Sequence, residues 1–308
     1  MSTFDANGIV TGYKVNRPLN GHEQKHRFNI RQPSSAQPHY DLSLVKLNST
    51  FVECVDKWYA MRGFVAMGGV AIASLFGYAF WAGMDDLLST FDFFAVLLSL
   101  GEFTLFLAGL YFFTRDAFTY THYPIRFNRK NRQVYVFRRD GTVLKAGWED
   151  IYWTIYGHNI GTHDLYVVGH VMAEDKTTIK ETFALSTTDA GAPGEQNLRS
   201  LFEFFRRYME EGPGPVLDAL KPAPLIMLPG IDKKKESWRF GWEVLTLSLN
   251  GMLVLQVLMQ IFFLPISLFR WIVMRTSKIP QWPQWVEDEC AVDPDDPWVR
   301  DGRHRAGS

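Results

Sequence analysis

The chain has 308 residues and a formal net charge of −1 at pH 7, from 32 basic and 33 acidic side chains. This balance excludes a strongly basic nucleic-acid binder and a disordered acidic protein. Aromatic residues make up 15% of the chain, which is typical of membrane-associated proteins with interfacial aromatic belts. Cys54 and Cys290 are the two cysteines, and they lie too far apart in sequence to indicate a disulfide scaffold or a cysteine metal cluster.

Residues 1–61 are predicted to form a polar N-terminal arm and a lead-in helix. The first 45 residues are rich in Asn, Gln, His, Pro and Ser and have little hydrophobic periodicity, which indicates a loosely ordered segment. Residues 42–61 are more apolar, and we expect them to form a short amphipathic helix that leads into the next segment.

Residues 62–115 contain two long apolar runs, Gly63–Met84 and Phe93–Thr114. Each run has about 22 residues, which at about 1.5 Å per residue gives a helix of roughly 33 Å. A helix of that length crosses a bilayer, so we predict a transmembrane helical hairpin. The alternative is a pair of helices buried in a soluble core, but such helices seldom stay apolar on all sides for this length.

Charge predicts the orientation of the hairpin. The link between the two runs contains Asp85, Asp86 and Asp92 but no Lys or Arg, whereas basic residues are frequent before and after the hairpin. Basic residues stay on the cytoplasmic side of a membrane. We therefore expect both ends of the hairpin to face the cytoplasm and the link to face outward.

Four hairpin residues are candidates for helix packing. Gly69, Ala73 and Gly77 repeat every four residues and would let a second backbone approach one face of the first helix. That backbone belongs either to the second helix of the same hairpin or to another copy in a homodimer. Glu102 is the one charge in the second run, and such a carboxylate is expected to be protonated or paired.

Two interpretations of Glu102 follow from its position near mid-depth. In one, it is a proton or ion site. In the other, a hydrogen bond to Ser74, Tyr78 or Trp81 fixes the register of the two helices. The second is favoured because a transport pathway needs polar groups from several helices.

Residues 116–221 change to the period of β-strands. Six short antiparallel strands are predicted between Ile125 and Leu185, with Asp140-Gly141 as a hairpin turn. Residues 195–211 then have apolar side chains at helical spacing. A curved meander closed by one amphipathic helix resembles a pleckstrin-homology-like architecture, and we expect this cytoplasmic domain to adopt it.

The predicted meander carries a set of basic side chains. One interpretation is that they face the inner leaflet and bind anionic lipid headgroups, at about 1 kcal/mol each. The other is that they lie on ordinary solvated strand faces. The residues concerned are Arg126, Arg129, Lys130, Arg132, Arg138 and Arg139.

Residues 222–279 comprise a proline-rich linker and a third apolar run, Val244–Phe269. Basic residues flank both ends of this run, whereas a spanning helix usually has them on one side. We favour a broken helix in the cytoplasmic interface, kinked at Pro265, over a third transmembrane span.

Residues 280–308 form a tail rich in Trp, Pro and carboxylates. It either packs on its own domain or recognises a basic partner through rigid rings and acidic groups. The candidate partner-binding residues are Trp282, Trp285, Glu287, Asp288, Glu289, Asp293, Asp295, Asp296 and Trp298.

No catalytic motif is recognisable in the sequence. The nucleophile elbow, the phosphate-binding loop, the dinucleotide fingerprint and the zinc-protease helix motif are all missing. His158, His163 and His170 are close in sequence but lack an identifiable fourth ligand. We therefore expect a protein that is not an enzyme and that holds no cofactor or metal.

The overall layout, with a polar arm, an apolar hairpin and then a meander, resembles a bacterial family of membrane-hairpin proteins found beside type VI secretion effectors. The residues that carry the likeness run from Tyr123 to about Leu185. The clearest matches are Ile125–Arg129, Val134–Phe137, Gly141 and Trp148–Ile151. The resemblance implies an inner-membrane immunity or accessory protein, as in toxin–antitoxin pairs. It covers about half of the chain and says nothing of catalytic residues.

The sequence therefore predicts a multi-pass inner-membrane immunity protein that neutralises a cognate effector on the cytoplasmic side. If that toxin is a nuclease, its basic cleft would suit the acidic tail. The alternative is a membrane-anchored scaffold or anionic-lipid-sensing module. Neither hypothesis requires direct binding of nucleic acid.

Overall fold

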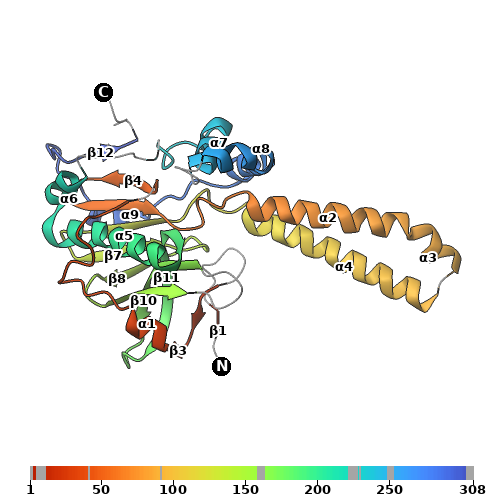
Figure 1. The fold of residues 1–308 in the computed structure, drawn as a ribbon, viewed down its shortest axis with the longest axis horizontal. Helices are drawn as coiled ribbons and strands as arrows, with labels where there is room; N and C mark the ends of the chain where they lie inside the picture. The colour runs from red at the N-terminus through yellow and green to blue at the C-terminus, as the bar shows by residue number, and fades with distance from the viewer. Residues whose placement is uncertain are drawn as a thin grey trace. The chain divides into compact units, whose positions relative to one another are not determined.

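The computed structural model describes residues 3–4, 12–40, 42–90, 92–157, 164–220, 228, 230–247 and 253–302. The chain has a mixed α+β fold and divides into two compact units (Figure 1). The sheet unit comprises Met1–Tyr59, His122–Lys234 and Ile279–Ser308. The helical unit comprises Ala60–Thr121 and Lys235–Lys278.

The larger sheet has six antiparallel strands in the order β12-β4-β5-β6-β7-β8. Val55 at the end of β5 lies opposite Pro124 at the start of β6. The segment Ala60–Thr121 is therefore an insertion between two neighbouring strands of one sheet. The strand bounds are β4 (Leu44–Leu47), β5 (Phe51–Val55), β6 (Pro124–Asn128), β7 (Gln133–Phe137), β8 (Val143–Gly147) and β12 (Arg300–Asp301).

The predicted lead-in helix at residues 42–61 is wrong, because this region contains β4 and β5. Its apolar residues happen to follow a helical spacing, and Glu53 would occupy the polar face of such a helix. In the structure Glu53 is 1% exposed and lies opposite Arg126 on β6. Pairing with a distant strand, which local periodicity cannot reveal, decides the conformation here.

The smaller sheet has four antiparallel strands in the order β3-β11-β10-β9. The six strands expected between Ile125 and Leu185 are present as β6 to β11, but they divide between two sheets. The chain changes sheet after β8 at Trp148, whose side chain is fully buried. The bounds are β3 (Arg17–Pro18), β9 (Ile151–Gly157), β10 (Asp164–Met172) and β11 (Thr178–Ala190), and β1 (Thr3–Phe4) pairs with β2 (Lys14–Val15).

Helix α5 (Gly191–Glu211) closes both sheets over a shared core, followed by the short helix α6 (Pro213–Ala219). Phe205 of α5 stacks on Phe127 of β6 with ring centroids 4.6 Å apart. Each such buried ring contributes about 1.5–3 kcal/mol. Nine of the chain's 46 aromatic residues are buried in this core.

Residues 12–40 are packed against this domain. Helix α1 (Gly21–Lys25) begins at Asn20, whose side chain accepts from the backbone N–H of Glu23. The N–H of Phe28 then donates to the carbonyl of Trp153 on β9 at 2.9 Å, and its ring stacks on Phe202 of α5. The described part of the predicted arm therefore covers the open edge of β9.

The helical unit contains the expected helical hairpin. Helix α2 (Phe64–Ala82) and helix α4 (Phe93–Asp116) run side by side, with α3 (Met84–Thr90) between them in sequence at the tip (Figure 1). A Cβ atom on Gly69 would lie 2.6 Å from the carbonyl oxygen of Gly109, and one on Gly109 would lie 2.5 Å from the backbone nitrogen of Ala73. A Cβ on Gly77 would meet the ring of Phe106 at 3.0 Å. The small-residue face of α2 thus packs on α4 of the same chain.

Glu102 lies on the same side of α4 as the buried residues Ser99 and Gly109, and it is half-buried. The structure shows no hydrogen bond from Glu102 to Ser74, Tyr78 or Trp81, so the register of the hairpin comes from the small-residue contacts.

Helices α7 (Trp238–Leu247) and α8 (Leu253–Thr276) complete the helical unit, and α8 continues through Pro265. Two buried ion pairs, Arg62 with Asp116 and Arg270 with Glu236, lie where α2 begins and α4 ends. We call this end of the helical unit its base. Among the described residues, α2 with α3, α4 and α8 are each long and apolar enough to cross a membrane.

Candidate protein-binding surface on the C-terminal tail

A buried arginine on the larger sheet organises this surface. Arg126 is 1% exposed, and its guanidinium lies between the rings of Phe51 and Trp282, at 4.6 and 4.9 Å from their centroids. Its Nε donates to Glu53, while Nη1 and Nη2 donate to the two oxygens of Glu287 at 3.0 and 2.9 Å. Burial alone would lower the pKa of Arg126, but the two carboxylates raise it, so the guanidinium stays charged.

Glu287 belongs to α9 (Gln284–Glu289), the helix of the C-terminal tail. The inner side of α9 is apolar, and Val286 and Cys290 are buried against Phe51 and Tyr135 of the sheet. The indole N–H of Trp282, just before α9, donates to Glu53 at 3.1 Å. A small apolar cluster and a bidentate ion pair therefore fix the tail to the sheet.

Further polar contacts continue along the tail. Lys145 donates to Glu289 at 2.7 Å, and this hydrogen bond lowers the pKa of the Glu289 carboxyl. Lys130 donates to Asp293 at 2.9 Å. Further on, the tail is held by Ser49 donating to Asp296, by Trp298 packing beside Gly214 and by β12 pairing with β4.

Two carboxylates of the acidic tail bind cations that were singled out from the sequence: Glu287 pairs with Arg126 and Asp293 pairs with Lys130. Glu289 pairs with Lys145 of β8, a cation outside the predicted set. Two of the other four predicted cations bind carboxylates of their own domain: Arg132 pairs with Glu149 and Glu210, and Arg138 pairs with Glu181. Arg129 lies beside Gly212, and Arg139 lines a cavity of about 30 Å³.

The outer side of α9 and the following loop remain uncovered. Trp285 is 43% exposed, although its ring centroid lies 6.0 Å from that of Tyr135. Asp288 and Asp295 are exposed. The tail therefore presents an ordered outer face of one tryptophan and several carboxylates, which we call the acidic ledge: Trp285, Asp288, Asp293 and Asp295.

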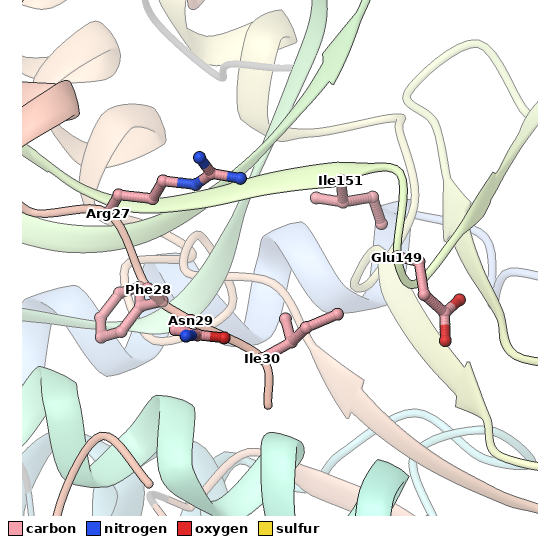
Figure 2. Close-up of a pocket in the computed structure, with 6 residues that line it drawn as sticks. All are labelled: Arg27, Phe28, Asn29, Ile30, Glu149 and Ile151. Carbon is pink, nitrogen blue, oxygen red and sulfur yellow. The ribbon is translucent and has the colours of Figure 1, made fainter. Parts of the chain in front are cut away.

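A second candidate site is a partly open cavity of about 340 Å³ beside β9 (Figure 2). This volume falls in the usual range for small-molecule sites. Its charged side chains are already engaged, because Arg27 lies over the ring of Tyr152 and Glu149 binds Arg132. The chemistry of the cavity therefore singles out no ligand. It is lined by Arg27, Phe28, Asn29, Ile30, Glu149 and Ile151.

A buried polar cluster was not anticipated from the sequence. Glu23 and His170 are both fully buried, with 3.4 Å between Glu23 Oε1 and His170 Nε2. Arg17 donates twice to Glu23, and Thr182 lies 2.8 Å from His170 Nδ1. Since this cluster is closed to solvent, it serves to fix the N-terminal segment on β10 and β11 rather than to bind a ligand.

No group of three His, Cys, Asp or Glu side chains in the described ranges could hold a metal ion. Two of the three histidines considered from the sequence, His158 and His163, lie outside the described residues. His170 belongs to the buried cluster.

The fold and the ledge define a class of protein: a two-sheet α+β domain with an inserted apolar hairpin and an acidic tail docked on its sheet. The chain belongs to a family of unknown function, DUF6708, whose model matches residues 102–294, more than half of the chain. No curated protein and no solved structure matches the chain significantly. The family description names no function, so the link to type VI secretion effectors stays a prediction.

Proposed function

We propose that this chain is a non-enzymatic, membrane-anchored binding protein that recognises a protein partner through the acidic ledge. The observation that carries the proposal is the division of α9 into two sides. Its inner side is bound to the sheet, whereas Trp285 and the outer carboxylates are uncovered. A rigid aromatic ring surrounded by polar groups is typical of binding hot spots.

The sheet unit supports a pleckstrin-homology-like architecture for the binding domain. Its two sets of antiparallel strands, β5 to β8 and β9 to β11, precede one amphipathic helix that closes them. The hairpin enters after the first of these strands. This order of elements supports our proposal of a binding domain interrupted by a membrane anchor.

Membrane anchoring follows from the insertion and its composition. Because Val55 and Pro124 are partners in one sheet, both ends of the hairpin must lie on the same side of any membrane it crosses. Helices α2 and α4 are long enough to cross twice. The acidic link and the basic flanks support a position of the sheet unit on the cytoplasmic side of a bacterial inner membrane.

Charge indicates the chemistry of the partner. The carboxylates of the ledge favour a basic protein surface and would speed association at low salt. A toxin with a phosphate-binding cleft, such as a nuclease effector, has such a surface, and neutralising a cognate effector is the role that the sequence resemblance implies. The ledge would cover the cleft as a preformed surface, since much of the tail is held by the sheet.

The alternative function, an anionic-lipid sensor that uses the basic strands, has less support. Arg126, Lys130, Arg132 and Arg138 each bind a carboxylate in the structure. A cation that is already paired attracts a headgroup weakly. This hypothesis would require the tail to leave the sheet.

Affinity capture from native membranes tests the partner. The tagged full-length chain should retain one stoichiometric protein at low salt, and less of it as salt increases. A ledge variant, Trp285→Ala with Asp288→Lys and Asp295→Lys, should lose that protein. The control variant Glu174→Lys, in the exposed β10–β11 turn, should keep it. Equal retention by all three proteins would remove the ledge from the proposal, and growth arrest by the captured protein alone would support the immunity role.

Cysteine accessibility tests the anchor. Cys54 and Cys290 are buried, so a single new cysteine can report with little background. Asp85→Cys, in the exposed link, should react with an impermeant maleimide added to intact spheroplasts. Glu174→Cys should react only after permeabilisation. Reaction of both from outside, or of neither, contradicts the predicted topology.

A further inference from the structure

We propose that helix α8, although long enough to span a bilayer, lies along the cytoplasmic membrane surface and docks the chain on lipid as a second attachment. The inference rests on the proposed function in one respect, that α2 and α4 span the membrane. It concerns a different element and a different interaction, an in-plane contact with the headgroup and upper acyl region.

Chain connectivity supplies the first argument. The segment Lys235–Lys278 leaves the sheet unit after Lys234 and returns to it at Ile279. The returning chain forms α9, where Glu287 binds Arg126 and the Glu289 carbonyl accepts from Asn128. Both ends of the segment are therefore on one side of the membrane, and it must cross an even number of times.

The described helices do not fit two crossings by α7 and α8. Over its described residues α7 has a length of 10 residues, or about 15 Å at 1.5 Å per residue, whereas the hydrocarbon core is roughly 30 Å thick. A single crossing by α8 would leave the tail on the wrong side. Helix α8 consequently does not span.

Packing within the helical unit gives a second, independent argument. Met259, Phe263 and Ile266 of α8 share one apolar cluster with Met67 of α2 and Leu245 of α7, and Val273 shares another with Ala66 and Ala117. The positions from Met259 to Val273 cover about 21 Å of α8, while Ala66 and Met67 are neighbours on α2. Helix α8 therefore crosses the base of α2 instead of running beside it, and Figure 1 shows α8 foreshortened where α2 and α4 extend across the page.

Buried polar contacts hold α8 next to the residues that precede α2. Arg270 donates to Glu236 at 2.5 Å and to the carbonyl of Ala60 at 3.2 Å. The backbone of α8 at Arg270 also occupies the space that a side chain on Gly63 would need, and Gly63 has a φ of +91°. Ala60 and Gly63 precede α2, so α8 lies where the chain enters the first helix.

The side of α8 away from these contacts is apolar and exposed. Val254, Val257 and Ile261 are 72–76% exposed, and the stripe continues at Leu258, Phe262, Leu264, Leu268 and Trp271. Positive charge gathers at the C-terminal end of α8, where the Lys235 ammonium donates to the carbonyl of Arg275 at 2.6 Å. A broad apolar stripe with basic residues at one end matches the surface of an anionic leaflet.

The polar residues of α8 face α7 and do not contradict this arrangement. The indole N–H of Trp242 donates to Gln260 at 2.6 Å, and that of Trp238 donates to Ser267 at 2.9 Å. Gln256 donates to the carbonyl of Thr246 at 3.2 Å. Helix α7 thus satisfies the polar groups and leaves the stripe free for lipid.

Depth-dependent quenching distinguishes an in-plane helix from a span. Full-length protein with one fluorophore at Val254→Cys, Ile261→Cys or Leu268→Cys is reconstituted in 3:1 phosphatidylcholine–phosphatidylglycerol vesicles, with quenchers at several acyl positions. The three sites span about 21 Å of helix. In-plane docking predicts equal, shallow depths, within about 5–10 Å of the headgroup boundary. The same labels at the exposed positions Phe94, Leu105 and Thr114 of α4, which lie near the start, middle and end of that helix, should be deepest at the middle site.

The outcomes separate the two claims. Shallow, equal depths in α8 with a depth maximum in α4 support both. A depth maximum in both helices overturns the surface position of α8 and leaves the hairpin as a span. A flat profile in α4 overturns the hairpin span and the inference that rests on it. Absence of quenching at all three α8 sites, with a normal α4 profile, overturns lipid docking alone.

Discussion

Arg62 and Asp116 cap each other's helices at the base of the hairpin. Asp116, the last residue of α4, accepts the backbone N–H groups of Gly63 and Ala66 at the start of α2, at 2.9 and 3.3 Å. Arg62 donates to the carbonyl oxygen of Asp116 at 3.1 Å and to its carboxylate at 3.0 Å. The carboxylate thus accepts from free N–H groups at the N-terminus of α2, and the guanidinium donates to a free carbonyl at the C-terminus of α4. The helix dipole favours a negative charge at the first position and a positive charge at the second.

Asp116→Asn should destabilise the helical unit strongly, because it leaves Arg62 charged and buried without its counter-ion. Removing one partner of a buried pair typically costs about 3–5 kcal/mol. Thermal unfolding of the detergent-solubilised protein measures the effect. Asp85→Asn in the exposed link is the control and should lie within about 0.5 kcal/mol of the wild type. Similar midpoints for the two variants would show that the pair does not hold the base.

Gly109→Ala should also lower the stability of the hairpin. The new methyl group would lie 2.5 Å from the backbone nitrogen of Ala73, so α2 and α4 must separate. Overpacking of this kind costs about 1–3 kcal/mol. Gly101→Ala is the matched control on the same helix, since nothing lies within 4 Å of its added methyl. Equal unfolding midpoints would argue against close packing at Gly109.

Glu287→Gln should loosen the tail, and Cys290 provides a native probe. Burial raises the pKa of the Cys290 thiol and shields it from reagents. The charged hydrogen bonds to Arg126 contribute roughly 1.5–3 kcal/mol, so opening should become about 10- to 100-fold more frequent. The rate of maleimide labelling at Cys290, with fully buried Cys54 as the internal control, measures this. Asp288→Asn, on the outer side of α9, should leave the rate unchanged.

Stability should depend on pH through Glu23 and His170. Burial alone would raise the pKa of Glu23, but hydrogen bonds from Arg17 and neighbouring groups lower it from 4.5 to about 2. Its contribution, at most roughly 3 kcal/mol, is complete above pH 4.5 and is lost as the pH falls towards 2. Burial lowers the pKa of His170 from 6.5, so protonation favours the unfolded chain and stability begins to fall below about pH 6.5.

Unfolding midpoints measured from pH 7.5 to 3.5 separate these two groups. His170→Gln should flatten the profile between pH 6.5 and 5, whereas Glu23→Gln should flatten it below 4.5. His39→Gln, at an exposed histidine, serves as the control and should retain the wild-type profile. An unchanged profile for His170→Gln would mean that His170 is not held neutral by burial.

The sequence predicted the elements that depend on local patterns. The alternation from Ile125 to Leu185 specifies strands, and the uninterrupted apolar runs specify α2 and α4. The failure at β5 has a physical reason, because Glu53 is buried only through its partner Arg126 on another strand. The docking of Glu287 on Arg126 joins residues 161 positions apart, and no local pattern reveals such a pairing.

The insertion of the hairpin between β5 and β6 also sets the order of assembly. Strand β5 is synthesised before the hairpin and its neighbour β6 after it, so the sheet cannot close while the hairpin is still being made. Burial of Phe127 and of α5 must follow that closure. Maturation of the sheet unit therefore waits for synthesis of α2 and α4, and it is completed only on chains in which both ends of the hairpin have been made.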